Sequence, residues 1–230
     1  MMKKLVVLTG AGISAESGIN TFRDADGLWE GHDVMEVATP QGFAANPTLV
    51  LEFYNQRRKE LSTVKPNKAH LNLVELENHF DVEIITQNVD NLHEKAGSKN
   101  VTHLHGELLK VRSSADESLI LDWNKDLILG DLCTKNSQLR PHIVWFGEMV
   151  PMLDKAIEIT KEADILVIIG TSMQVYPAAS LVDYIKPKTP IYFIDPKPQI
   201  SENDFNDLTI IKNVASLGTH KLIELLNKIT

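Results

Sequence analysis

The sequence predicts an α/β protein built on a doubly wound parallel sheet of about six strands, with a smaller inserted domain. Short apolar runs rich in Val and Ile alternate along the chain with segments of helical periodicity. The first run, residues 5–8, is followed by Gly10 and Gly12, as expected of a first strand that is buried on both faces. Two irregular segments, 20–66 and 107–140, interrupt the alternation and predict the inserted domain.

Each element can be placed from its pattern. The expected strands are residues 5–8, 82–86, 101–104, 165–169, 191–194 and 208–211. The expected helices are 48–61, 66–80, 152–163, 178–185 and 219–229, with a short helix opening between Ser14 and Ser17. Right-handed crossovers would bring the C-terminal ends of all the strands to one edge of the sheet.

Composition narrows the class of protein. The 230 residues are 43% hydrophobic with a net charge of −8, which suits one soluble unit or a large domain with an inserted small one. The acidic balance argues against non-specific nucleic-acid binding. A single cysteine fits a reducing compartment, and neither a signal peptide nor a membrane span is expected. We therefore expect a cytoplasmic protein without a membrane or nucleic-acid partner, for which a monomer is plausible and the oligomeric state is open.

Polar and glycine-rich sequences follow the strands at the edge where ligands bind in open α/β sheets. They are Gly10-Ala11-Gly12, Gln87-Asn88-Val89-Asp90, His105-Gly106, Gly170-Thr171-Ser172 and Asp195. The glycines before a helix start suit a pyrophosphate, although glycines in this place are equally often a simple turn. The Asn and Asp can likewise be a turn that caps the next helix, and His103 suits a structural role. His105, at a strand end in the crevice, is a good general base.

The second strand ending in Asp or Glu that a hydride-transferring dinucleotide enzyme needs is missing. Asp24, Asp26 and Glu30 lie at about the right distance from the glycines, but no strand precedes them. The turn thus favours NAD in a protein other than a dehydrogenase.

Taken together, the motifs resemble those of the sirtuins, NAD-dependent protein-lysine deacylases, in order and over nearly the whole chain. The resemblance rests on Gly10-Ala11-Gly12-Ile13-Ser14, Gly18-Ile19 with Phe22-Arg23, Gln87-Asn88-Val89-Asp90, His105-Gly106, Phe146-Gly147-Glu148 and Gly170-Thr171-Ser172. It implies a Rossmann-like NAD-binding domain of residues 1–19, 67–106 and 141–230. The small domain would be residues 20–66 and 107–140.

The resemblance also implies the roles of the site residues. His105 would be the general base and Asn88 a second catalytic residue in a reaction that yields free lysine, nicotinamide and O-acyl-ADP-ribose. Val144 and Phe146 would align and cover the acyl-lysine of a substrate protein. The expected cofactor-binding residues are Gly10, Ala11, Gly12, Ser14, Ile19, Phe22, Arg23, Trp29, Gln87, Asn88, Asp90, Gly170, Thr171, Ser172, Asp195 and Ala215. The family usually has Asn where Asp195 stands.

Tyr54 and Arg57 share a face of the helix expected at 48–61, because they are three residues apart. An exposed aromatic and a solvated cation would be unremarkable on an arbitrary helix. The sequence around them, Phe53-Tyr54-x-x-Arg57-Arg58, is however similar to the class III sirtuin pattern, in which Tyr and Arg bind an acidic acyl group. Thr21, where many sirtuins have Asp, fits the same class. The resemblance thus implies removal of succinyl, malonyl and glutaryl groups, with acetyl as a further substrate.

The sequence departs from the family at zinc, which sirtuins commonly hold with four cysteines in the second insertion. Cys133 is the only cysteine, Ser113 and Ser114 stand where a first pair would begin, and His142 is isolated. A closed structural site needs four good ligands, so no metal is expected. Packing of apolar side chains would hold the module instead, namely Leu119, Ile120, Leu121, Trp123, Leu127, Ile128 and Leu132.

Two other functions use the same NAD site. A protein ADP-ribosyltransferase would employ a different nucleophile and yield labelled protein. A non-catalytic NAD-sensing module would bind NAD without releasing nicotinamide, which His105, Asn88 and Asp90 argue against.

Overall fold

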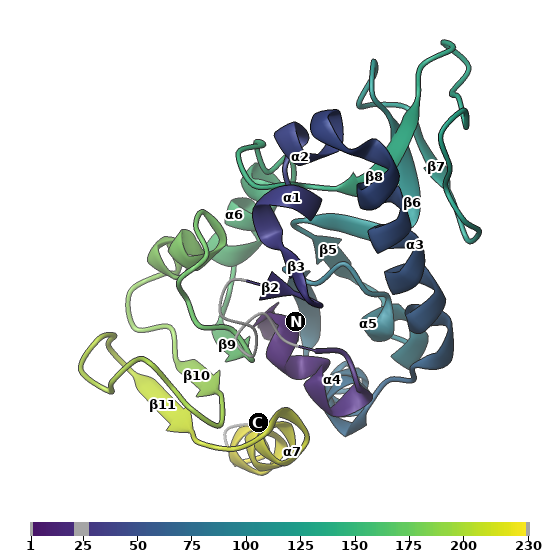
Figure 1. The fold of residues 1–230 in the computed structure, drawn as a ribbon. Helices are drawn as coiled ribbons and strands as arrows, with labels where there is room; N and C mark the ends of the chain where they lie inside the picture. The colour runs from purple at the N-terminus through teal and green to yellow at the C-terminus, as the bar shows by residue number, and fades with distance from the viewer. Residues whose placement is uncertain (1, 21–27, 229–230) are drawn as a thin grey trace.

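The structure, a computed structural model, describes residues 2–20 and 28–228. Its six-stranded sheet has the order β11 (Leu208–Ile211), β10 (Ile191–Ile194), β9 (Ile165–Ile169), β1 (Lys4–Thr9), β4 (Asp81–Thr86), β5 (Val101–His103) (Figure 1). All neighbouring strands are parallel. The chain winds from β1 to one edge and then, from β9, to the other, which confirms the predicted doubly wound α/β fold.

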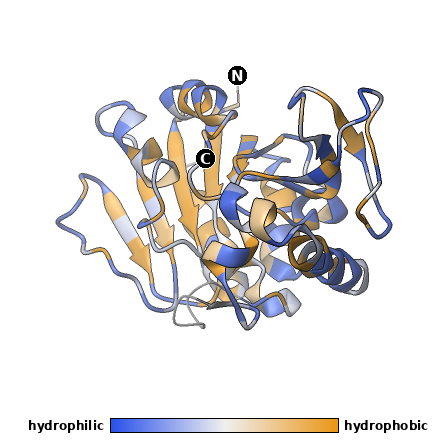
Figure 2. Ribbon diagram, turned by 45° about the horizontal axis from the view of Figure 1, so that its top comes forward, coloured by the Kyte–Doolittle hydropathy of each residue, from blue (hydrophilic) through white to orange (hydrophobic). Residues whose placement is uncertain are grey.

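Alternate residues of β1 enter different layers of core. Leu5 and Val7 pack with helices α4 (Lys68–Leu76) and α7 (Ala215–Leu226). Val6 and Leu8 pack with α6 (Leu153–Lys161) and the 3-10 helix η4 (Ala178–Tyr184) on the opposite face. The central strands are accordingly apolar almost throughout (Figure 2). This two-sided burial holds the strand ends, and the loops after them, in fixed places.

The remaining elements come from the two segments that interrupt the alternation. The first supplies β2 (Leu28–Trp29), β3 (His32–Asp33), α1 (Val34–Val37), α2 (Pro40–Ala45) and α3 (Pro47–Thr63). After β4 come α5 (Leu92–Ala96) and β5, and then an antiparallel sheet of β6 (Gly106–Ser113), β7 (Ile120–Asp122) and β8 (Leu139–Ile143). Helix α3 lies against β6 and β8 (Figure 1). The domain boundaries expected from the sequence remain a prediction.

The expected packing of residues 119–132 is wrong for four of its seven residues. Leu127 is buried, and Leu119 and Trp123 pack against the same cluster, whose other members are Leu51, Val111, Cys133 and Leu139. The side chains of Ile120, Leu121, Ile128 and Leu132 are instead between 43% and 61% exposed. Ile120 and Leu121 are exposed because they stand in β7, an edge strand whose three residues are all exposed, and Ile128 and Leu132 lie in the loop between β7 and β8.

Some element bounds and types also differ from expectation. The expected helix at 178–185 is a 3-10 helix, and the short helix after Ser14 is the three-residue 3-10 helix η2 (Ala15–Ser17), preceded by η1 (Ala11–Ile13). Helix α7 begins at Ala215, four residues before the expected start at Thr219. In the part of the chain that the structure describes, no helix combines the length and the apolar character needed to cross a membrane.

Candidate active site

The loops after β1 and β9 are in direct contact through their backbones. The N–H of Gly10 donates to the carbonyl of Ile169 at 3.0 Å, and that of Gly12 to the carbonyl of Gly170 at 2.9 Å. A Cβ at Gly12 would lie 2.6 Å from the Cα of Gly170, and one at Gly10 2.8 Å from the Cβ of Thr171. Any larger residue would push the loops apart, so the glycines allow the two loops to pack backbone against backbone.

A cluster of polar side chains, Ser14, Asn88 and Asp90, contacts the glycine loop after β1. The side-chain amide of Asn88 donates to the carbonyl of Gly10 and to Ser14 Oγ, both at 3.2 Å. Ser14 Oγ in turn donates to Asp90 Oδ2 at 3.0 Å. Burial raises the pKa of Asp90, and the hydrogen bonds from Leu92 and Ser14 oppose this effect. Ser14, from the segment after β1, and Asn88 and Asp90, from the loop after β4, thus form one connected network.

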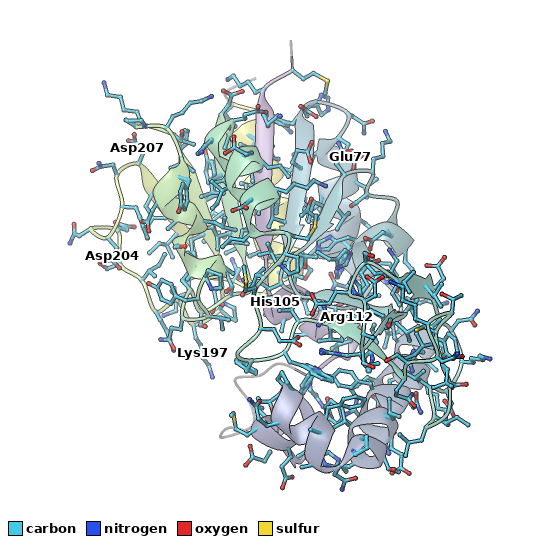
Figure 3. All side chains as sticks on the ribbon, turned by 90° about the horizontal axis from the view of Figure 1, so that it is seen from above. Glu77, His105, Arg112, Lys197, Asp204 and Asp207 are labelled. Carbon is cyan, nitrogen blue, oxygen red and sulfur yellow. The ribbon has the colours of Figure 1, made fainter. Side chains whose placement is uncertain are left out.

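The ring of His105 is oriented by the neighbouring loop. Its Nδ1 lies 3.0 Å from the carbonyl oxygen of Gln87. A carbonyl can only accept, so Nδ1 carries the proton and Nε2 keeps its lone pair. Burial lowers the pKa of His105, against the opposing effect of the Gln87 carbonyl, so the ring is a neutral base at pH 7. His105 lies near the centre of the molecule, where the ends of the strands meet the small sheet (Figure 3).

Two contacts keep this loop in place. The side chain of Gln87 donates to Thr171 Oγ1 at 3.2 Å, which joins the loops after β4 and β9. Gly106 has a φ of +82°, and a side chain there would collide with the carbonyl of His142. The residue after the base must therefore be glycine for β6 to run beside β8.

Tyr54 and Arg57 are neither exposed nor solvated. Tyr54 is completely buried, and its hydroxyl accepts a hydrogen bond from Trp145 Nε1 at 2.9 Å. Arg57 is only 12% exposed, lies over the ring of Phe53 at 4.9 Å and forms two hydrogen bonds of 2.9 Å to Glu60. Its third nitrogen, Nη1, is buried and has no partner among the described residues. The N–H groups on this one nitrogen of the guanidinium are therefore not satisfied.

The segment 144–148 directly follows β8 of the small sheet. The N–H of Val144 donates to the carbonyl of His105 at 2.9 Å, which places this segment beside the base. Phe146 is exposed, and its expected role in covering the acyl-lysine stays a prediction. Glu148 accepts hydrogen bonds from Arg112 and Arg140 and from the N–H of Trp145. The sequence indicated Glu148 only as part of a motif, and the structure gives it a role as an anchor.

The other predicted cofactor residues occupy several places. Asp195 is buried after β10, where Oδ1 accepts from the N–H of Lys197 at 2.8 Å, and Ala215 opens α7. Ile19 and Trp29 pack with Phe53 and Tyr54, and the ring of Trp29 is 4.9 Å from that of Phe53. The expected residues Thr21, Phe22 and Arg23 lie outside the described residues.

The residues at this edge fit NAD. A tight glycine turn at the end of the first strand, an amide and a carboxylate joined through Ser14, and an oriented neutral histidine suit a dinucleotide and its ribose.

The positions of the usual zinc cysteines do not fit zinc. Cys133 Sγ donates to Ser113 Oγ at 3.2 Å, Ser114 lies 2.7 Å from Ser137, and Lys135 pairs with Asp116 at 2.6 Å. Across residues 2–20 and 28–228, no three His, Cys, Asp or Glu side chains are grouped as metal ligands.

Known proteins resemble this chain over most or nearly all of its length. An "NAD-dependent protein deacylase" of Helicobacter pylori is 65% identical over 85% of this chain and 86% of its own length. One of Bacteroides thetaiotaomicron is 51% identical over 98% of both chains. The crystal structure of a Sir2 homolog–NAD complex has a TM-score of 0.86 and 41% identity, covering 99% of this chain and 91% of its own. Sir2 bound to acetylated peptide has a TM-score of 0.80 and 29% identity, over 98% and 94%.

The model of the Sir2 family matches residues 10–177, a span that includes the glycine loop, the Gln87–Asp90 cluster, His105 and the segment 144–148. On this match and on the agreement of the fold with solved structures, the chain belongs to the Sir2 family.

Proposed function

We propose that this protein removes acidic acyl groups, namely succinyl, malonyl and glutaryl, and also acetyl, from lysine side chains of proteins at the expense of NAD. The coarser activity, that of an NAD-dependent protein deacylase, follows from membership of the Sir2 family and from relatives of that name that match most of the chain. The observation that carries the proposal is the neutral, oriented His105 beside the network of Ser14, Asn88 and Asp90.

Different residues at the strand ends would bind different parts of NAD. The backbones of Gly10, Gly12 and Gly170 would admit the pyrophosphate, with Thr171 and Ser172 beside it. Asp195 and Ala215 would lie at the adenosine, and Asn88 and Asp90 at the nicotinamide ribose and its carboxamide. NAD supplies the ribose carbon that receives the acyl group, and nicotinamide as the leaving group.

His105 acts on a proton of the ribose. Its Nε2 accepts a hydroxyl proton while Nδ1–H stays on the Gln87 carbonyl, so the ring does not rotate as it becomes charged. The half-buried site lowers the pKa of the ring and so keeps the base form available at pH 7. Val144, tied to the carbonyl of His105, would align the acyl-lysine, and Phe146 would cover it.

The preference for acidic acyl groups rests on α3. The unpartnered Nη1 of Arg57 offers a donor to a carboxylate, and the Tyr54 hydroxyl still has its own proton to donate because its contact with Trp145 uses only an oxygen lone pair. Glu60 already occupies two donors of Arg57, so an incoming carboxylate either takes Nη1 or displaces Glu60. Glu60 is exposed on the helix surface, which makes its displacement inexpensive.

Mass spectrometry of matched peptides tests the function. Acetyl-, succinyl-, malonyl- and glutaryl-lysine peptides are incubated with the protein, with and without NAD. Unmodified lysine and O-acyl-ADP-ribose should form only with NAD, and the acidic acyl groups should react faster than acetyl. ADP-ribosylated protein in place of these products would favour a transferase, and NAD binding without nicotinamide release would favour a sensing module. Equal rates for all four peptides would remove the acyl preference alone.

A further inference from the structure

Asn88 is held through its backbone as well as through its side chain. Its N–H donates to Thr86 Oγ1 at 3.0 Å, and its carbonyl oxygen lies 3.0 Å from Nδ1 of His103. His103 ends strand β5, next to β4, and so approaches the loop from the side opposite to Gly10. The sequence favoured a structural role for His103, but its ring contacts the site residue directly.

His103 has a second partner that determines its charge. Its Nε2 is 2.7 Å from a carboxylate oxygen of Glu94, on α5. A carbonyl and a carboxylate both require a donor, so both ring nitrogens carry protons and His103 is an imidazolium. Burial lowers the pKa of His103, but Glu94, the Asn88 carbonyl and Glu107 outweigh it, and the net pKa is raised.

The surroundings of the pair are acidic and open on one side. Glu94 and His93 from α5, Asp90 from the loop after β4, and Glu107 from β6 are the titratable groups whose charge couples to His103. The side chain of His103 is 7% exposed and that of Glu94 is 41% exposed. A pocket of about 200 Å³, lined by Asp90, Glu94, Glu107 and Lys110 among others, lies beside them. Water can therefore exchange protons with the pair.

We propose that Glu94 and His103 position Asn88 for NAD, and that they do so only while His103 carries both ring protons. This rests on the proposed function, in which Asn88 serves NAD. When the ring loses one proton, Glu94 keeps the other on Nε2, because a carboxylate is a stronger acceptor than a carbonyl. The lone pair of Nδ1 then faces the carbonyl of Asn88, and the loop moves away from its position against Gly10 and Ser14.

The variants separate the charge from the contact. Glu94→Gln removes the carboxylate that holds the proton on Nε2, so a neutral His103 can place its proton on Nδ1 and keep Asn88 in place. His103→Asn supplies a donor that does not titrate, near the position of Nδ1. His103→Leu removes the donor. The exposed pair of His220 and Glu224 on α7, 3.6 Å apart, gives matched controls in His220→Leu and Glu224→Gln.

Three measurements are made on the whole protein across about pH 6 to 10: kcat/KM for NAD, NAD affinity by calorimetry, and NMR of the Asn88 amides without NAD. For the wild type and both controls, affinity and kcat/KM should fall on the alkaline side, and the Asn88 signals should follow the titration of His103. Glu94→Gln and His103→Asn should abolish this alkaline loss. His103→Leu should weaken NAD binding and lower kcat/KM about 10- to 100-fold at neutral pH.

An alkaline loss that persists in both Glu94→Gln and His103→Asn would overturn the proposal, as would Asn88 signals that ignore the titration of His103. Normal NAD binding by a folded His103→Leu variant would do the same. The proposed function can fail separately: if the wild type binds NAD but turns over no acyl peptide, calorimetry and NMR still decide whether the pair positions Asn88.

Discussion

Replacing Arg57 with methionine should damage the removal of succinyl groups far more than the removal of acetyl groups. Methionine keeps an unbranched apolar side chain but loses the guanidinium, whose central carbon lies 4.9 Å from the centre of the Phe53 ring. An acetyl group has no carboxylate, so its transition state loses no direct contact. A succinyl carboxylate would enter a site where the native cation is 12% exposed, and so would lose a charge-assisted hydrogen bond in a largely desolvated place.

The size of the effect follows from that contact. A hydrogen bond to a charged group contributes about 1.5–3 kcal/mol, which corresponds to roughly a 10- to 150-fold loss in kcat/KM for succinyl-lysine. In the native protein, Glu60 reduces the free energy that Arg57 contributes to binding the succinyl carboxylate. The ion pair of Arg57 with Glu60 contributes about 0.2–1 kcal/mol, and the incoming carboxylate must displace or share it. Glu60→Gln should therefore raise kcat/KM for succinyl-lysine by up to about fivefold, with no change for acetyl-lysine.

The assay is the ratio of kcat/KM values for acetyl- and succinyl-lysine in one peptide sequence. Lys59→Met is the matched control, because Lys59 lies on the same helix, is exposed and pairs with Asp126 on the surface. It should leave the ratio unchanged. An equal fall in both activities for Arg57→Met would show that Arg57 only stabilises the helix. Unchanged activities would show that Arg57 does not bind the acyl group. Either result refutes the reasoning.

Three further outcomes are expected. His105→Ala should lower deacylation about 10²- to 10⁴-fold while NAD still binds, measured by steady-state kinetics and calorimetry, and near-normal turnover would remove His105 from the mechanism. Elemental analysis of the purified protein should find no stoichiometric zinc, and chelators should leave its Tm unchanged; one zinc per chain would contradict this. Burial lowers the pKa of His70 to about 4 from an ordinary 6.5, so the stability that its neutral form carries is complete above pH 6.5 and is lost as the pH falls towards 4. Urea unfolding at about pH 4.5 should show a loss of about 2–3 kcal/mol from this residue, and His70→Gln should make the decline shallower.

The sheet was predictable because its strands are buried on both faces. Residues 165–169 are apolar throughout, and a short run of β-branched and apolar residues is typical of a strand buried on both faces. The glycine loop and the Gln87–Asp90 cluster were predictable because parallel strands end at one edge, so separate motifs had to meet. The neutral state and the orientation of the His105 ring could not be predicted. They depend on the backbone carbonyl of Gln87, and a backbone group leaves no signal in the sequence.

The small sheet was harder to predict, because apolar residues at the edge of a thin sheet are exposed. Ile120 and Leu121 have the composition of a core strand but stand in β7, which has a neighbour on one side only. The contact of His103 with Asn88 was missed for a different reason. Its partners Glu94 and Asn88 lie 9 and 15 residues away along the chain, and only the fold brings all three together.

The buried hydrogen bond from Trp145 to Tyr54 has a consequence for how acyl preference can evolve. Losing the phenol would leave an indole N–H buried without a partner, at a cost of about 1–3 kcal/mol, whatever acyl group the enzyme prefers. If Tyr54 serves acidic acyl groups as proposed, selection for stability alone can therefore retain it after selection for acidic substrates has ended. Among the described residues, the only charged partner of Arg57 is the exposed Glu60. Loss of Arg57 would therefore not leave a buried polar group without its partner. Of the two residues, the arginine should be the better marker of acyl class, and the first to change when a descendant turns to another substrate.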